Sequence, residues 1–499
     1  MDRRAFLRSS VLASGAVLAG RMGIAQATPS VSAQLKLNRR KRGNPIAMDF
    51  TGLSYESAQL SQPDFFSASN AELVGYVRRL GANGVLRIGG NSSEYCSWAP
   101  EGAPAQSATA QNQAQANVIS DALGSDKGHH SLPKKTITPE AVRNLGTFVE
   151  ATGWKLIYGL NMGTGTAEAA ADEAAFVMGT MGDRLIAFQL CNEPDLFSRN
   201  GLRSPDYNYA QFAQEWQTFY GAIKRRVPNA PFAGPDTAFN NEWLVPFAKQ
   251  FKSEVAFLSQ HYYAEGPPTD PWMTIERLLK PNPKLKLEFE GMAETQAESH
   301  LPFRLAETNS CYQGGKQGVS DTFASALWGA DLMYQLAAAG GVGINFHGGG
   351  YGWYTPIAGT VENGFTARPI YYGMLLFAEA GAGHLIEAKL QGQGAAPLLT
   401  AYGLVNDAQD SVTAVVINKN ADVNVRLGFD TGERAGSARV LRLVAPRLDD
   451  TQDVTLGANP VGGSGAWSDE RDEELPVRDG TAMLDLPAGS AALVTFRAG

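Results

Sequence analysis

Two glutamates, Glu193 and Glu307, each end a short apolar segment that has the composition of a buried strand. Two carboxyl groups on either side of a glycosidic bond can cleave it, one as a proton donor with a raised pKa and the other as an ionised nucleophile. A single glutamate at a strand end is more often a cap or an ion-pair partner. Asn192 before the first glutamate and Thr308-Asn309 after the second favour chemistry on a sugar over that simpler interpretation.

The elements that must position these glutamates fall between residues 48 and 382, where short apolar runs alternate with amphipathic stretches. Eight runs are apolar on both faces, which is typical of strands in a covered parallel sheet. They are Met48–Tyr55, Gly84–Gly89, Lys155–Asn161, Leu185–Glu193, Pro231–Pro235, Val255–Tyr263, Pro302–Glu307 and Val342–His347. This alternation predicts a (β/α)₈ barrel, and the absence of a Gly-x-Gly-x-x-Gly turn after the first strand disfavours a doubly wound sheet. Glu193 then lies on the fourth strand and Glu307 on the seventh, at the C-terminal mouth where such barrels hold active sites.

Some helix ends and one loop can be located from residue types. Thr138 and Pro139 predict a helix start, with an end near Gly153, and Ser204-Pro205-Asp206 predicts the start of another helix. Residues 101–135 are rich in Ala, Gln, Ser and Asn, which indicates a long loop after the second strand, on the face of the active site.

Beyond residue 382 the pattern changes to alternating apolar and polar residues with Gly, Asn and Asp turns. This predicts an antiparallel β-sandwich over residues 383–499. Residues 28–47 contain the strand-like run Val31–Leu37, which we expect to join that sheet. The sandwich strands expected from the pattern are Leu398–Val405, Ser411–Ile417, Val423–Phe429, Arg439–Leu443 and Ala491–Phe496.

Residues 1–27 have the features of an export signal. Arg3, Arg4 and Arg8 precede a short apolar run, and Ala25-Gln26-Ala27 offers a cleavage site. The apolar run is too short to span a membrane. The paired arginines favour a twin-arginine signal over an ordinary secretory signal, so we expect export to the bacterial periplasm or the medium.

Charge and cysteine content exclude several classes. The chain has 42 basic and 50 acidic residues, and removing residues 1–27, with four Arg and one Asp, leaves 38 and 49, a net charge near −11. Such a chain is not expected to bind nucleic acid. Three cysteines make no disulfide framework, and the histidines lack metal-site spacing, so neither a metal nor a cofactor is expected. Nothing in the sequence specifies an oligomeric state.

Motifs around both glutamates resemble a known family. Asn192-Glu193-Pro194 with a glutamate on strand seven resembles the clan A retaining glycosidases, which are built on (β/α)₈ barrels. The run from Glu307 to Gly315, Glu-Thr-Asn-Ser-Cys-Tyr-Gln-Gly-Gly, resembles more narrowly the nucleophile segment of glycoside hydrolase family 79, which contains heparanase and bacterial β-glucuronidases. Leu86–Asn91 and Gln260–Tyr263 fit the same family, so the resemblance covers nearly all of the chain after residue 27.

The resemblance implies roles for individual residues. Glu193 would be the acid/base and Glu307 the nucleophile, while Asn192 would bond the sugar 2-hydroxyl and Arg87 would keep the nucleophile ionised. His261 is interpreted as an orienting neighbour rather than a base. The other implied substrate contacts are Glu56, Asn91, Tyr263, Tyr312, Gly314, Gly315, Lys316 and Tyr354.

The loop that begins at Tyr312 decides the sugar class. Tyr312, Gly314 and Gly315 match family positions that receive a uronate carboxylate, and backbone N–H groups can approach such an anion closely. The acidic chain has no long basic cluster apart from Lys280–Lys286, which favours release of a terminal glucuronic acid over internal cleavage. We therefore expect a retaining exo-β-glucuronidase acting on a glucuronide-containing carbohydrate. The alternatives are a glycosidase for neutral sugars, an endo-acting heparanase-like enzyme, and a carbohydrate-binding protein without catalysis.

Overall fold

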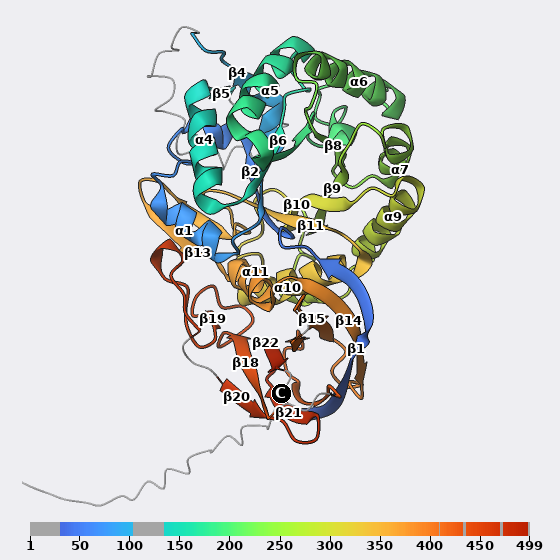
Figure 1. Ribbon diagram of the computed structural model, residues 1–499, viewed down its shortest axis with the longest axis vertical. Helices are drawn as coiled ribbons and strands as arrows, with labels where there is room; N and C mark the ends of the chain where they lie inside the picture. The colour runs from blue at the N-terminus through green and yellow to red at the C-terminus, as the bar shows by residue number, and fades with distance from the viewer. Residues whose placement is uncertain (1–29, 103–133, 409, 433–435, 470–472, 498–499) are drawn as a thin grey trace, which may run out of the picture.

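The computed structural model describes residues 30–102, 134–408, 410–432, 436–469 and 473–497. Eight parallel strands close into a barrel in chain order, as the sequence predicted (Figure 1). The strands are β2 Thr51–Glu56, β3 Val85–Gly89, β6 Lys155–Gly159, β7 Leu185–Gln189, β8 Phe232–Thr237, β9 Phe257–Glu265, β10 Phe303–Cys311 and β11 Gly343–Gly348. The expected export signal lies outside the described residues, as does most of the expected loop at 101–135.

The barrel interior is filled in layers. Val85, Ile157, Ala187, Ala233 and Phe257, one from each of five neighbouring strands, form a small cluster separate from the large core under the helices. Side chains alternate between the two faces of a strand, so residues two positions further on face the interior in the next layer toward the mouth. That next layer is polar, and it forms the floor of the site described below.

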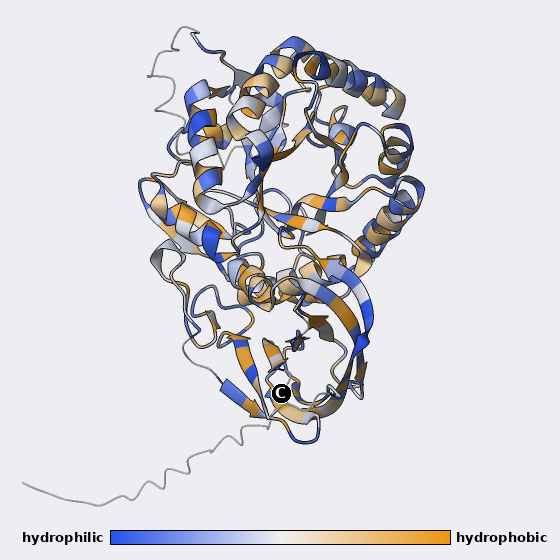
Figure 2. Ribbon diagram, in the orientation of Figure 1, coloured by the Kyte–Doolittle hydropathy of each residue, from blue (hydrophilic) through white to orange (hydrophobic). Residues whose placement is uncertain are grey.

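Helices α1 and α4 to α11 lie around the barrel, and Figure 2 shows that their ribbons carry both hydrophobic and hydrophilic residues. Their buried apolar residues belong to one large core cluster with residues of the strands. Helix α4 Pro139–Thr152 has the predicted ends, since Thr138 accepts from the Ala141 N–H at 3.3 Å and Gly153 adopts a left-handed φ of 80°. The start of helix α6 was predicted at Ser204, and this prediction was wrong. Helix α6 Tyr209–Arg226 begins after Asn208, because Asn208 and Gln211 form a complete capping box there.

Among the described residues, the remaining barrel helices of eight or more residues are α1 Ala71–Arg79, α5 Ala167–Met181, α7 Asn241–Gln250, α9 Pro283–Ser299, α10 Phe323–Ala339 and α11 Pro369–Ala380. In the described part of the chain, no helix is long and apolar enough to cross a bilayer.

The second domain is a ten-stranded sheet, antiparallel except for one pair, that curves around its own core (Figure 1). Strand β1 Ser30–Ile46 pairs antiparallel with β14 Gly383–Gln391 and parallel with β17 Asn424–Asp430, so the N-terminal strand does join this sheet. The other strands are β15 Leu399–Val405, β16 Ser411–Asn418, β18 Ser437–Val444, β19 Thr455–Leu456, β20 Glu473–Pro476, β21 Thr481–Leu486 and β22 Ser490–Arg497.

Helices α10 and α11 lie between the barrel strands and this sheet (Figure 1). A buried ion pair joins Asp331 of α10 to Lys419, which follows β16, and Thr400 and Tyr402 of β15 both donate to the same carboxylate at 2.7 Å. The two domains are thus joined by a buried, hydrogen-bonded polar cluster.

Candidate active site

Two irregularities in the barrel strands aim acidic side chains into the barrel. Glu307 was expected to end its strand, but β10 runs on to Cys311, and its pairing with β9 shifts register between Leu305 and Glu307. A register shift of this kind reverses the face on which later side chains lie. Arg304 and Glu307, three residues apart, therefore both reach the interior. A similar shift in β8, between Pro235 and Thr237, brings Asp236 to the interior as well.

Arg87 of β3 is the centre of the polar layer and is fully buried. Its guanidinium donates to the side chains of Glu307, Asp236, Asn192, Gln189 and Ser54. A planar guanidinium with several fixed donors suits such a convergence of acceptors, and these five come from β10, β8, β7, the loop after β7 and β2. The expected contact between Arg87 and the nucleophile candidate is therefore present, as part of a larger network.

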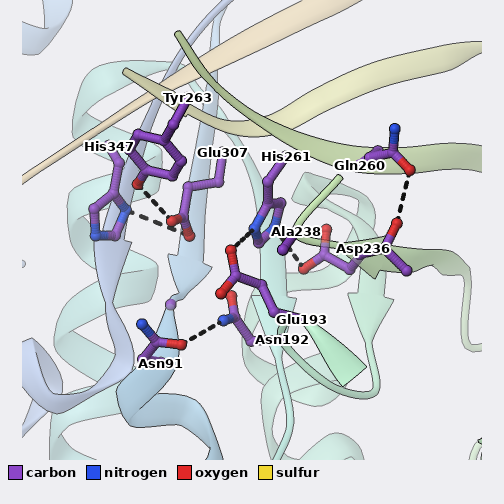
Figure 3. Close-up of polar contacts among 12 residues, drawn as sticks. Asn91, Asn192, Glu193, Asp236, Ala238, Gln260, His261, Tyr263, Glu307 and His347 are labelled. Atoms are coloured by element: carbon purple, nitrogen blue, oxygen red, sulfur yellow. Dashed lines mark hydrogen bonds and ion pairs between the residues drawn. The ribbon is translucent and has the colours of Figure 1, made fainter. Parts of the chain in front are cut away.

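Glu307 is surrounded by donors. Arg87 bonds one of its oxygens, and the Tyr263 hydroxyl donates to the other at 2.7 Å (Figure 3). The Nδ1 atom of His347 lies 3.6 Å from the carboxylate. Burial by itself would raise the pKa of Glu307, but the charges of His347, His261 and Arg87, with the Tyr263 bond, lower that pKa well below its ordinary range. These donors therefore favour the ionised form of Glu307.

Glu193 lies beyond its strand rather than at its end. Strand β7 ends at Gln189, and Glu193 adopts a left-handed conformation with φ 49° and ψ 54°. Its backbone N–H donates to the Asp236 carbonyl at 2.9 Å, which fixes this strained turn against β8. The turn directs the Glu193 carboxylate toward Glu307, and one oxygen of each lies within 4.8 Å of the other.

His261 of β9 links Glu193 to the network beneath it. Its Nδ1 atom lies 3.0 Å from Glu193, and its Nε2 atom lies 3.2 Å from Asp236 (Figure 3). Burial would lower the pKa of His261, but Asp236 and Glu307 together raise it to about 10. His261 is thus an imidazolium that donates from both nitrogens. In turn, Arg87 and His261 overcome the effect of burial and lower the pKa of Asp236.

Asn192 is held with its side chain beside the two glutamates. Its backbone N–H donates to Glu94 at 2.5 Å, its Oδ1 atom accepts from Arg87, and its Nδ2 atom donates to Asn91 at 3.2 Å. Glu94 is buried, and burial, although opposed by two backbone N–H groups, raises the pKa of its carboxyl to about 8.

The other residues with expected substrate contacts divide into two groups. The ring of Tyr354 packs beside Tyr263 at 6.2 Å and beside His347 at 6.0 Å, and Tyr312 lies at the rim with its ring 6.4 Å from Tyr263. Glu56 forms the second group: it is buried like Tyr354, one of its oxygens accepts from the N–H and hydroxyl of Ser92, and the other lies 3.5 Å from the Nε2 atom of His347.

The loop after β10 carries the residues expected to contact a uronate. Gln313, Gly314 and Gly315 are three successive residues with positive φ, at 59°, 84° and 86°. A side chain at Gly315 would collide with the backbone of Tyr354, so the close approach of these two loops requires glycine there. The Lys316 ammonium donates to the Asp270 carbonyl at 2.8 Å, so it anchors the loop rather than projecting freely into the mouth.

One group of side chains has the spacing of a metal site. Ligand atoms of Glu193, His261 and Glu307 all lie within 4.8 Å of one another. The chemistry of the donors does not fit a resident metal, since a metal ligand must be deprotonated while His261 holds its proton strongly and Arg87 already neutralises Glu307. All three cysteines are buried and free, in keeping with the absence of a disulfide framework in the sequence.

Sequence reasoning missed Asp236, Gln189, His347 and Ser54 as members of the site. Gln189 and Ser54 occupy the interior layer directly above Ala187 and Gly52, so alternation along each strand could have indicated them. His347 ends the predicted eighth strand, and a polar residue at that place was a usable signal. Asp236 could not be found in this way, because its inward direction depends on the register shift in β8.

The chain is similar to known β-glucuronidases and to a heparanase. No protein-family model matches the chain. It is 22% identical over 386 residues to a β-glucuronidase of Neurospora crassa, covering 69% of this chain and 65% of that protein, less than two thirds of the relative's length. It is 23% identical over 403 residues to heparanase of Bos taurus, covering 72% of this chain and 71% of that protein.

A solved structure shows the same fold. A 4-O-α-L-rhamnosyl-β-D-glucuronidase from Fusarium oxysporum superposes with a TM-score of 0.70 at 18% identity, covering 94% of this chain and 100% of that one. The closed barrel with an attached β-sheet domain is therefore a fold that this chain shares with a solved glycosidase structure. The relatives named β-glucuronidase and heparanase agree with the resemblance to glycoside hydrolase family 79 that the motifs indicated.

Proposed function

We propose that this protein is a glycoside hydrolase that releases terminal β-linked glucuronic acid with retention of configuration, through a covalent glycosyl-enzyme intermediate. The observation that carries the proposal is the approach of Glu193 and Glu307 oxygens to within 4.8 Å. Retaining glycosidases hold their two carboxyl groups about 5–5.5 Å apart, whereas inverting enzymes leave about 6.5–9.5 Å for a water molecule. The spacing found here supports direct attack by a carboxylate on the anomeric carbon.

The surroundings of the two glutamates support a division of labour between them. Glu307, ionised and bonded by Arg87 and Tyr263, is the nucleophile that forms the glycosyl ester. Glu193 donates a proton to the leaving oxygen, and then removes a proton from the water that hydrolyses the ester. Asn192 lies where it can bond the sugar 2-hydroxyl, a contact that strengthens in an oxocarbenium-like transition state.

His261 serves Glu193 rather than replacing it. Because its pKa is raised to about 10, it keeps its proton at neutral pH and cannot act as a general base. Its contacts with the Glu193 carboxylate at 3.0 Å and with Asp236 at 3.2 Å hold Glu193 in place from below.

The loop from Tyr312 to Lys316 supports specificity for a uronate. A glucuronide differs from a glucoside by a negative charge at C6, so discrimination requires donors at that position. The Tyr312 phenol stands at the rim beside Tyr263, and the Gly314-Gly315 backbone can approach an anion without an intervening side chain. The homologous β-glucuronidases support the same specificity.

Two further proposals concern the mouth and the destination of the protein. Strands β4 Ser97–Trp98 and β5 Thr136–Ile137 pair with each other, so both ends of the long segment between them are anchored after β3 on the mouth side of the barrel. Exo-action is supported by the acidic charge of the chain, which has no long basic cluster apart from Lys280–Lys286. The paired arginines of the leader support export as a folded protein.

The proposal is tested by turnover of p-nitrophenyl β-glucuronide and the matching glucoside. We expect the glucuronide to be strongly preferred, the product to keep the β configuration in NMR, and a mechanism-based fluoro-sugar to label Glu307. Glu307→Gln should abolish turnover. As a matched control, Glu173→Gln alters another buried glutamate, one that bonds Tyr158 outside the site, and should remain active. Inversion at the anomeric carbon would refute the mechanism, and equal turnover of both substrates would refute the sugar class.

A further inference from the structure

A cavity of about 560 Å³ lies between the barrel and the sheet domain, outside the site described above. From the barrel it is lined by the loops after β10 and β11 and by the start of α11. From the sheet domain it is lined by residues 451–454, just before β19. Figure 1 shows α11 between the barrel and β19. The lining residues used below are Gln317, Asp321, Trp353, Thr366, Arg368 and Gln452.

The wall contributed by the sheet domain is fixed in place. The backbone N–H groups of Phe323 and Ala324, at the start of α10, donate to the carbonyls of Asp450 and Leu448 at 2.7 and 2.9 Å. The Tyr372 hydroxyl accepts from the Val461 N–H at 2.9 Å on the other side of this segment. The cavity is therefore a built feature between two anchored domains.

The loops after β10 and β11 both line the cavity and both carry residues of the candidate active site. Tyr354 packs against Tyr263 and His347 of that site, while its chain neighbour Trp353 lines the cavity. The loop after β11 thus has one residue packed against the candidate site and the preceding residue at the cavity.

Two side chains in the cavity lack the partners that such groups usually have. Trp353 leaves 38% of its surface exposed. The Arg368 guanidinium stacks on the Trp353 ring at 5.7 Å, yet makes no hydrogen bond or ion pair with any residue that the structure describes. The buried Asp321 carboxylate accepts a hydrogen bond from the Gly318 N–H. Its negative charge acts on Arg368 through space, without a hydrogen bond between the two side chains.

This set of groups matches a sugar that carries an anionic substituent. An exposed indole can pack against the C–H face of a pyranose ring, and the amides and hydroxyls of Gln317, Gln452 and Thr366 can bond ring hydroxyls. A guanidinium without a partner can form a bidentate pair with a carboxylate or sulfate.

We propose that this cavity is an accessory subsite that binds an acidic sugar unit of the substrate chain, beyond the unit that is cleaved. The choice of an acidic sugar chain as the ligand rests on the proposed function. The existence of a binding site is argued from the cavity and its lining residues alone. The subsite would make longer acidic chains better substrates than simple aryl glucuronides. It would contribute through ground-state binding, so its loss should raise KM and leave kcat nearly unchanged.

The test compares Trp353→Ala and Arg368→Gln with wild type on two substrates. On a hexasaccharide of alternating glucuronic acid and N-acetylglucosamine, we expect KM to rise at least tenfold, as removal of a charged hydrogen bond or a stacking contact predicts. On p-nitrophenyl β-glucuronide, which is too short to reach the cavity, kcat/KM should change less than twofold. Tyr351→Ala is the matched control, since Tyr351 is a neighbouring exposed aromatic residue outside the cavity lining.

Binding is measured separately from turnover, so that failure of the proposed function can be recognised. Calorimetry on Glu307→Gln with the same hexasaccharide should show binding that weakens at least tenfold when Trp353→Ala is added. Cellohexaose, a neutral chain of equal length, should bind far more weakly. Trp353→Phe, which keeps an aromatic ring, should retain binding and exclude a folding defect. Unchanged hexasaccharide affinity in both Trp353→Ala and Arg368→Gln would overturn the subsite, whatever reaction the protein catalyses.

Discussion

Replacing Asp236 by Asn should convert His261 from a group that is cationic at neutral pH into one that titrates near neutral pH. The substitution keeps the shape of the side chain and removes one negative charge from the buried network. Asp236 lies 3.2 Å from the Nε2 atom of His261. Of the groups that raise the pKa of His261, the Asp236 carboxylate has the largest effect. Arg87 retains its other acceptors, including Glu307, so the site can remain assembled.

The size of the effect follows from the geometry. Two unit charges 3.2 Å apart interact by about 5 kcal/mol at an effective dielectric constant near 20. At about 1.4 kcal/mol per pKa unit, this corresponds to a fall of roughly four units. The pKa of His261 should therefore drop from about 10 to about 6. Above that pH the neutral imidazole can no longer donate to both Glu193 and residue 236, so Glu193 loses its support.

The assay is the ratio of variant to wild-type kcat/KM for p-nitrophenyl β-glucuronide between pH 5 and pH 8. We expect the ratio to fall at least tenfold across this range, with a midpoint near pH 6. ¹⁵N NMR of the His261 ring should show the same transition in the variant and a constant imidazolium in wild type. The double variant Asp236→Asn/His261→Gln should lack the pH-dependent loss. A flat ratio, or a variant His261 that stays protonated at pH 8, would refute the electrostatic account of this network.

Three further predictions concern specificity, stability and export. Tyr312→Phe should lower the ratio of glucuronide to glucoside kcat/KM, and an unchanged ratio would mean that this phenol does not contact the carboxylate. Lys419→Met should lower the free energy of unfolding by about 3–5 kcal/mol in denaturant titrations, because it leaves Asp331 buried without its cation; Asp331→Asn in the same chain should restore part of the loss. Changing Arg3 and Arg4 to Lys should retain active precursor in the cytoplasm, and unchanged export would favour the ordinary secretory route.

Much of the fold was predictable from local pattern. The eight barrel strands could be found because each is apolar on both faces and bounded by turns, a pattern that buried parallel strands must have. The sheet domain could be found because its strands alternate, although β14 and β19–β21 were not identified. Helix α4 has a Thr cap, a first-turn proline and a terminal glycine, all local signals. The start of α6 was missed because Ser204-Pro205 and Asn208 are both good starts, and only the capping box decides between them.

The sequence by itself determined the chemistry available at the mouth. Residue types and spacing around Glu193 and Glu307 indicated a carboxylate pair, and the order of strands placed both at the C-terminal end of one barrel. These conclusions needed only strand count and motif, since every strand of a parallel barrel ends at the same face.

Tertiary structure alone decided how those groups act on one another. The inward direction of Asp236 and Glu307 depends on register shifts against neighbouring strands, which leave no local mark in composition. The charge of His261 depends on carboxylates 25 residues before it and 46 residues after it in the chain. Electrostatic interactions act through distances of a few ångströms in a buried setting, and those distances exist only once the barrel has closed.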